Sequence, residues 1–199
     1  MLPPTVPLIW KRSTRARRIT LRIEPVRGEV IITVPERISR DMALAFVHQQ
    51  TEWITNALAA LPEKQALADG SEVMIEGRSI PILHEPTARR GCWLDAEGLH
   101  VSGEATHTER RVRDFLQAMA KERLTQTLQT HSAKMDLHPA RLDLRDVRTR
   151  WGSCTRQGRI MLSWRLLMAP TEIRDYVVIH ELAHLKHFNH GPDFSALVD

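Results

Sequence analysis

The chain has 199 residues, of which 42% are hydrophobic and 26% charged, enough for one domain or two small lobes with a buried core. Its two cysteines, Cys92 and Cys154, are too few for a disulfide framework and lack the spacing of a thiolate zinc site, which indicates a reducing compartment. No secretory signal is recognisable and no run approaches the ~18 apolar residues that span a bilayer, so we expect a cytoplasmic protein outside the membrane.

The formal net charge of +4 is unevenly placed along the chain. Residues 10–40 contain nine Lys/Arg and three Glu. The basic segment 11–22 could make weak contact with the phosphates of a nucleic acid. The interpretation we favour is a solvated strand edge whose charges discourage pairing with another strand. Both interpretations stay open.

The first hundred residues read as β structure with one helix. Residues 19–23 and 30–34 alternate in polarity around Gly28, which predicts a hairpin. Ser39 is a plausible N-cap for a core-packing helix whose apolar residues, Trp53 among them, recur at helical spacing up to Pro62. Four short strand-like runs between glycines and prolines then predict a meander, at 73–75, 80–83, 92–94 and 99–101.

The second half predicts more helix. Residues 109–130 form an amphipathic pattern, strands are expected at 141–147 and 159–164 around a turn-containing segment 150–154, and a helix opens at Pro170 and Thr171. Strands followed by segregated helices predict an α+β fold. The expected layout is a β-rich N-terminal lobe, residues 1–104, followed by a lobe with a small sheet and a motif-bearing helix, residues 105–199. The last residues, up to Asp199, are expected to belong to a further helix.

The helix after Pro170 carries the most informative motif. His180-Glu181-Leu182-Ala183-His184 places two histidines four residues apart, so both imidazoles lie on one helix face and can reach one ion. On the adjoining flank, Glu181 can take the proton of a metal-bound water as it attacks a carbonyl and later deliver it to the leaving amine. The motif therefore predicts a Zn²⁺-dependent hydrolase with Glu181 as general base.

A catalytic zinc site needs a third protein ligand and an open position for water. His190 follows His184 by six residues, the spacing of the third histidine in H-E-x-x-H-x-x-G-x-x-H, and is the leading candidate. His187 stands where that pattern has glycine, so we expect the helix to continue past His184 and to turn near Asn189. His187 itself is either a rival ligand or an exposed cation at the helix end.

Five segments of the last third form a recognisable combination: 150–154 (RWGSC), 158–164 (GRIMLSW), 176–184 (YVVIHELAH), Asn189-His190 and Phe194. They resemble the YgjP-like metallopeptidases and, more distantly, the SprT-like and minimal zincin proteases. The resemblance implies a zincin-like second lobe, the two lobes together forming one YgjP-like domain, and a zinc peptidase acting on polypeptides. It also implies His180, His184 and His190 as metal ligands and Glu181 as the catalytic base.

Residues beside the motif have two interpretations each. In zincin folds a strand beside the cleft can pair with an extended peptide, so Arg150 and Trp151 are candidates to line the cleft, unless Trp151 is a core aromatic. Cys154 is either a thiolate that blocks the open metal position or a small buried hydrophobe. Tyr176 either assists the oxyanion or packs in the core, as its helical spacing favours.

The leading hypothesis is peptide-bond hydrolysis by a zinc-activated water. One alternative is a nucleic-acid-associated protein with a tethered or inactive zinc lobe. Another is a zinc hydrolase of a non-peptide amide. Oligomeric state and cleavage specificity are not predicted. The histidines without ligand spacing are interpreted as ordinary surface or hydrogen-bonded residues: His48, His84, His100, His107, His131 and His138.

Overall fold

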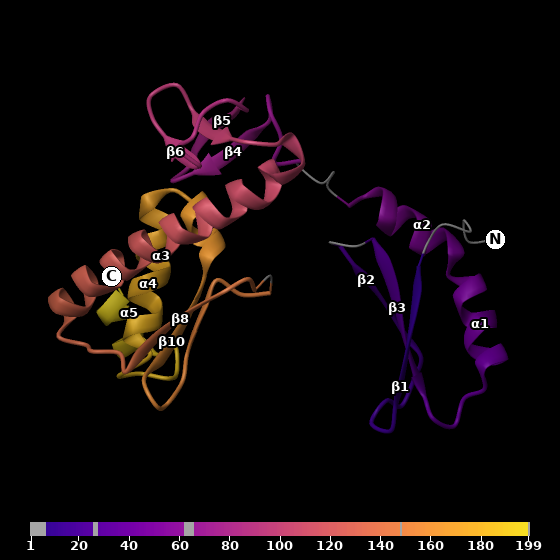
Figure 1. Ribbon diagram of the computed structural model, residues 1–199. Helices are drawn as coiled ribbons and strands as arrows, with labels where there is room; N and C mark the ends of the chain where they lie inside the picture. Colours follow the sequence, from indigo (N-terminus) through magenta and orange to yellow (C-terminus); the bar gives the residue numbers. More distant parts are fainter. Residues whose placement is uncertain (1–6, 26–27, 62–65, 148, 199) are drawn as a thin grey trace. The chain divides into compact units, whose positions relative to one another are not determined.

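A computed structural model describes residues 7–25, 28–61, 66–147 and 149–198 of the chain. The chain divides into two units, Met1–Gln65 and Ala66–Asp199, with indigo to purple and magenta to yellow ribbons in Figure 1. Both units combine helices with small sheets, which confirms the predicted α+β class. Among the described residues, no helix is long and apolar enough to cross a membrane.

The first unit contains a three-stranded sheet. β2 (Thr20–Glu24) pairs antiparallel with the central β3 (Glu29–Pro35), which confirms the predicted strand pairing, while residues 26 and 27 of the turn lie outside the described residues. β1 (Leu8–Ser13) pairs parallel with the other edge of β3. This strand was not predicted, because two exposed cations in succession, Lys11 and Arg12, interrupt its alternation.

Two helices stand where one was predicted. α1 (Arg40–Gln49) is capped by Ser39, whose Oγ accepts the Met42 N–H at 3.2 Å, and α2 (Thr51–Ala59) follows after Gln50. At Gln50 the backbone leaves helical geometry, with φ −97° and ψ 12°. Trp53 is 47% exposed, so its predicted core position is wrong, while its neighbour Ile54 is fully buried.

The core of the first unit lies between β3 and the two helices. Alternate residues of β3 face this core and the intervening ones face the other side of the sheet, as a two-residue period requires. The buried apolar side chains are Val30, Ile32, Val34, Ala43, Val47 and Ile54.

The second unit begins with a four-stranded sheet. It contains β4 (Glu72–Ile75), β5 (Arg78–Glu85), β6 (Cys92–Leu94) and β7 (Leu99–Ser102) in the order β4-β5-β7-β6. β7 lies between β5 and β6 and runs parallel to β5, so the predicted meander is wrong. All four residues of β7 are buried, which favours an inner position over a sheet edge.

The four-stranded sheet belongs to the same unit as the helix that carries the histidine motif. The structure therefore divides after residue 65, whereas the sequence analysis placed the boundary after residue 104. The reason is a shared core: α3 (Thr108–Met135), which follows the short helix η1 (Ala105–His107), packs against β6 and β7. The core residues shared by these strands and α3 include Ile82, Leu99, Val101, Val112, Leu116 and Leu124.

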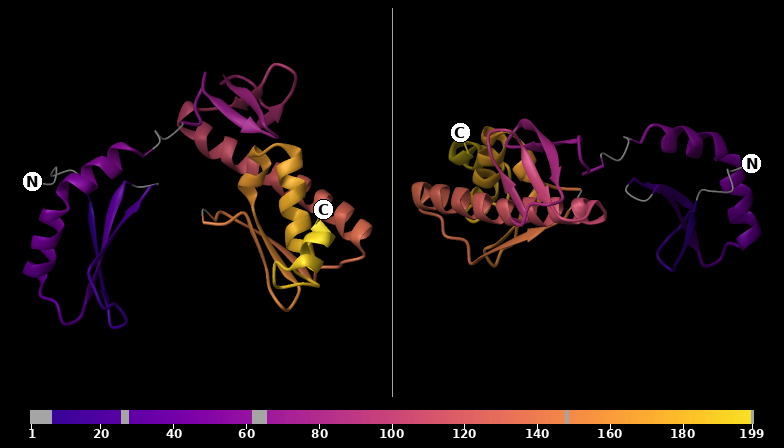
Figure 2. Two further views of the ribbon diagram at one scale, coloured as in Figure 1. Left: turned by 180° about the vertical axis from the view of Figure 1, so that it is seen from behind. Right: turned by 45° about the horizontal axis from the view of Figure 1, so that its top comes forward.

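A second sheet and three helices complete the unit. β8 (Arg141–Arg145), β10 (Arg159–Ser163) and β9 (Gly152–Cys154) form a sheet in the order β8-β10-β9, with β8 parallel and β9 antiparallel to β10. The turn predicted at 150–154 is therefore largely a strand. After η2 (Trp164–Met168), α4 (Thr171–Ala183) packs against α3, β9, β10 and α5 (Pro192–Val198), an arrangement visible in Figures 1 and 2.

Candidate metal centre

Helix α4 positions the first two histidines of the motif and Glu181. It begins at Thr171 and ends at Ala183, with His184 as C-cap. The His184 N–H still points to the His180 carbonyl at 3.4 Å, so the two histidines lie one turn apart. The expected continuation of the helix past His184 is wrong: the N–H groups of residues 185–187 turn back to the carbonyls of Leu182 and Ala183.

Three histidine rings converge at this point of the chain. One ring nitrogen from each of His180, His184 and His190 lies within 4.8 Å of the others. The Nε2 atoms of His180 and His190 are 3.3 Å apart. Two nitrogens that each lie about 2.0–2.1 Å from a tetrahedral zinc ion are separated by about 3.3 Å. The spacing of this pair therefore fits a common metal ion.

The ionisation of His180 and the orientation of the His184 ring also fit a metal. Burial, helped by the neighbouring His184 and His190, lowers the pKa of His180 and so favours the neutral imidazole that metals require. His184 Nδ1 lies 2.9 Å from the backbone carbonyl oxygen of His187. If Nδ1 donates its hydrogen there, Nε2 of His184 is left as the free acceptor.

His187 thus enters the arrangement through its backbone. Among the described residues, the cluster contains the ring of His190 and not that of His187. The structure therefore brings together the three histidines that the motif spacing favoured. The rival ligand serves instead as a carbonyl acceptor that orients His184.

Phe194 packs against all three imidazole rings. Its ring centroid lies 4.9 Å from that of His180, 4.8 Å from that of His184 and 4.7 Å from that of His190. The side chain is 5% exposed and belongs to α5. Sequence reasoning had found Phe194 only through the family pattern, since a single phenylalanine gives no local signal of this contact.

Glu181 is the buried carboxyl group of the site. It is 6% exposed, and its Oε2 has no hydrogen-bond partner among the described residues. Burial raises its pKa to about 7, although the positive charge of Arg150 opposes the shift. A carboxyl group whose pKa lies near neutrality can both accept and return a proton at physiological pH.

Strand β9 passes directly over Glu181. A Cβ atom at Gly152 would lie 2.5 Å from Oε1 and 2.6 Å from Cγ of Glu181, so this contact requires glycine. Sequence reasoning interpreted Gly152 as a turn residue and missed the contact. The signal that could have revealed it is a glycine inside a strand, which often marks a close backbone approach.

Three exposed aromatic side chains, which we call the aromatic rim, accompany the site: Trp151, Tyr176 and Phe188, at 54%, 56% and 44% exposure. The Tyr176 ring lies 6.1 Å from that of His180, and the Phe188 ring 6.2 Å from that of His184. Trp151 immediately precedes Gly152. The core-packing interpretation is therefore wrong for Trp151 and Tyr176. Trp164, in contrast, is a core residue at 5% exposure.

Cys154 lies outside the histidine cluster. Its Sγ donates to the Thr155 carbonyl at 3.5 Å, and its side chain packs partly against the core. Burial, followed by the negative charge of Glu181, raises the pKa of the thiol. The protonated thiol is a poor metal ligand, so the structure favours the packing interpretation over a blocking thiolate.

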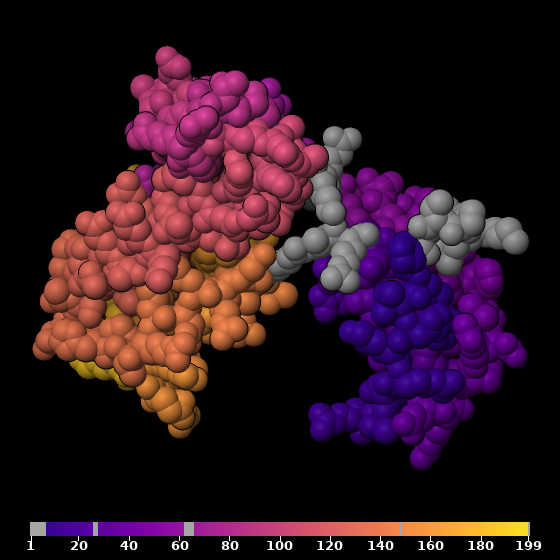
Figure 3. Space-filling model, in the orientation of Figure 1, coloured from indigo at the N-terminus to yellow at the C-terminus, as the bar shows by residue number. Residues whose placement is uncertain are grey.

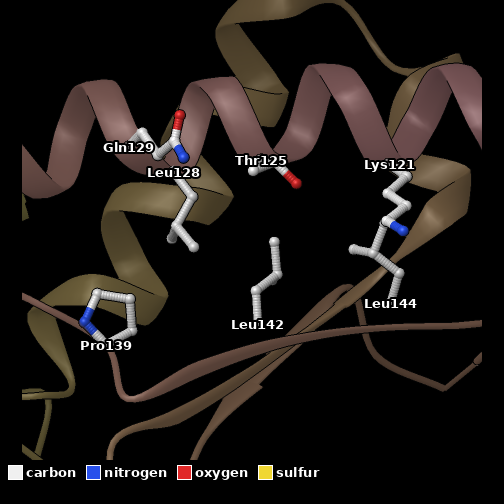
Figure 4. Close-up of a pocket in the computed structure, with 7 residues that line it drawn as sticks. All are labelled: Lys121, Thr125, Leu128, Gln129, Pro139, Leu142 and Leu144. Atoms are coloured by element: carbon white, nitrogen blue, oxygen red, sulfur yellow. The ribbon is translucent and has the colours of Figure 1, made fainter.

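A separate hollow of about 560 Å³ lies between α3 and β8 (Figure 4). Leu128 from α3 and Leu142 from β8 approach each other across it. None of its lining residues belongs to the histidine cluster or is Glu181. This hollow is therefore separate from the candidate metal centre, whose residues belong to α4, β9 and the segment after α4.

Comparison with known proteins places these observations in a family. No curated protein in the comparison matches the chain. Among solved structures it is similar to the metallopeptidase zymogen of Pyrococcus abyssi abylysin, with 24% identity, a TM-score of 0.35, and coverage of 38% of this chain and 75% of that chain. The family model of the YgjP-like metallopeptidase domain, however, matches residues 17–199. The chain therefore belongs to the YgjP-like metallopeptidase domain family.

Proposed function

We propose that the protein is a zinc metallopeptidase in which His180, His184 and His190 hold Zn²⁺ and Glu181 is the general base. The observation that carries the proposal is the convergence of three histidine ring nitrogens. The α4 turn that carries two of these histidines also carries Glu181, a buried carboxyl group whose Oε2 has no partner among the described residues. Three imidazoles that leave one coordination position open are a typical donor set of a catalytic zinc. A structural zinc site would need a fourth protein ligand, and the cluster among the described residues has three members.

A zinc ion held there would supply Lewis acidity toward the scissile carbonyl and lower the pKa of a water molecule. Glu181 accepts the proton of the attacking water and returns it to the leaving amine. Its pKa of about 7 suits both transfers near neutral pH. The positive charge of Arg150 favours the ionised carboxylate and so keeps a fraction of Glu181 competent as a base.

The second edge of β9 supports a polypeptide as substrate. Within the described part of the chain, β9 pairs with β10 alone, so its other edge is available to an extended peptide. Strand addition supplies main-chain hydrogen bonds that a small amide cannot form. The close contact of Gly152 with Glu181 means that such a peptide lies beside the general base. The aromatic rim offers apolar surface to its side chains.

The test is metal content together with cleavage of an unfolded protein. We expect about one zinc per chain, lost in His190→Ala and retained in the matched variant His187→Ala. Glu181→Gln should keep its zinc and lose hydrolysis, and turnover by that variant would remove Glu181 from its role. A wild-type protein that hydrolyses small amides and no polypeptide would favour the non-peptide alternative. Failure to bind zinc after reconstitution would refute the proposal.

A further inference from the structure

The excess positive charge of the chain belongs to the first unit. Residues 1–65 contain ten Lys/Arg and six Asp/Glu, whereas residues 66–199 contain eighteen of each. The unit with the metal centre is therefore neutral overall. The first unit has a hydrophobic core of its own, distinct from the core of the second. Its charge is thus a property of a separate structural unit.

The topology gathers many of these cations at one end of the sheet. β1 runs parallel to β3 and β2 runs antiparallel to it. The connections 14–19 and 36–39 therefore emerge at the same end, the lower end of this unit in Figure 1. We call the four arginines of these connections the basic end. They are Arg15, Arg17, Arg18 and Arg37, and indigo side chains project there into solvent in Figure 3.

The four arginines of the basic end are available to a partner. All four are exposed, and none has a side-chain hydrogen bond or ion pair among the described residues. Arg12 differs, because its Nη1 donates to the carbonyl oxygens of Pro35, Glu36 and Ile38 at 3.3, 3.1 and 2.9 Å. Arg12 therefore fastens the connection 36–39, which contains Arg37, to the end of β1, the strand that leads into the connection 14–19.

We propose that the basic end binds the phosphate backbone of double-helical DNA. Planar guanidinium groups with several donors match phosphate oxygens better than single ammonium groups do. Two carboxylates, Glu36 and Asp41, belong to the connection 36–39 and the first turn of α1, and the four arginines outnumber them. The N-terminus of α1, which begins at Arg40, adds the positive end of a helix dipole at the same place.

Single-stranded nucleic acids and membrane surfaces fit these connections less well than a duplex does. Single strands usually bind through bases stacked on aromatic side chains, and residues 14–19 and 36–39 contain none. Amphipathic segments that lie on a membrane surface bury apolar side chains beside their cations. The large apolar residues of the two connections, Ile19 and Ile38, instead pack against the core of the first unit. The pattern therefore favours a duplex backbone, read without regard to base sequence.

The number of arginines sets the expected salt dependence. Four phosphate contacts predict a slope of about −3.6 in a plot of log K against log salt, or roughly a 150-fold loss of affinity between 50 and 200 mM. The measurement is fluorescence anisotropy of a labelled DNA duplex of mixed sequence, titrated with the full chain across this salt range. It does not depend on peptidase activity, so it stands apart from the test of the metal centre.

The variant replaces all four arginines of the basic end by Gln, and its matched control removes four exposed cations of the second unit: Arg89, Lys134, Arg145 and Arg159. We expect the basic-end variant to lose roughly 100-fold in affinity at 50 mM salt and most of its salt slope, and the control to stay within about 3-fold. Thermal melting checks that both variants fold. Absence of duplex binding at 50 mM, equal weakening by the control, or tighter binding of single strands or of anionic vesicles would each overturn the proposal.

Discussion

Replacing Gly152 by Ala should disable Glu181 while leaving the three histidines in place. The added Cβ would lie 2.5 Å from Oε1, 2.6 Å from Cγ and 2.8 Å from Cδ of Glu181. Non-bonded heavy atoms normally keep about 3.5–4.0 Å, so the carboxyl group must move by about 1 Å. A misplacement of this size costs on the order of 100-fold in rate. Gly152 does not have a positive φ, so Ala causes no backbone strain there.

The assay measures kcat on an unfolded protein substrate and zinc content in the same preparation. We expect Gly152→Ala to retain its zinc, because the three atoms nearest to the added Cβ all belong to Glu181 and none to a histidine ring. Its kcat should fall by about 100-fold. A variant that keeps both zinc and wild-type kcat would refute the argument that the β9 backbone fixes the position of Glu181.

Two other glycines provide controls. A Cβ at Gly191, next to His190, would meet Asn189 Nδ2 at 3.7 Å, an ordinary contact, so Gly191→Ala should resemble the wild type. A Cβ at Gly98 would lie 2.6 Å from the Pro81 carbonyl oxygen, so Gly98→Ala should lower stability and leave kcat intact. Activity lost equally in Gly98→Ala and Gly152→Ala would mean that general destabilisation explains the effect.

Three further predictions concern ionisation and substrate binding. Because burial raises the Glu181 pKa from 4.5 to about 7, the native state loses stability as pH rises through this window. In metal-free protein, Glu181→Gln should therefore add up to about 3 kcal/mol at pH 8 and almost nothing at pH 4, measured by chemical unfolding. Burial alone would lower the pKa of His100, yet hydrogen bonds to two carboxylates raise it overall. The stabilisation from protonated His100 is therefore present below about pH 6.5 and lost as pH rises through the native pKa. His100→Gln should flatten this pH dependence of the free energy of unfolding. Tyr176→Ala and Phe188→Ala should each raise KM by about 10-fold through lost apolar contact, whereas the equally exposed Trp53→Ala should not, and an equal effect of Trp53 would remove the aromatic rim from substrate binding.

The sequence predicted those parts of the site that depend on local geometry. His180 and His184 meet because residues four apart lie on one face of any helix. His190 followed from a known spacing, even though the helix ends earlier than expected. The contact of Gly152 with Glu181 could not be predicted in this way, since it joins a strand and a helix separated by 29 positions of sequence. The same holds for Phe194, whose ring reaches three histidines from another helix.

The fold shows the same division between local and non-local features. Periodicity located most strands and α3 to within a few residues, because alternation and helical spacing are properties of the segment itself. Periodicity did not predict the strand order of the four-stranded sheet, because nothing in the short sequence of β7 indicates its inner position. It also failed to group that sheet with α3, because the shared core depends on packing between segments far apart in sequence.

The construction of the metal centre has a consequence for the first unit. The three histidines lie on α4 and the segment after it, Phe194 on α5, and Gly152 on β9, all within the second unit. The contacts described for the three histidine rings and for Glu181 thus come from residues 150–194. The first unit supplies none of these groups, yet it has its own core and the net positive charge of the chain. On the DNA-binding proposal made above, the exposed arginines of the basic end would localise the second unit on a duplex.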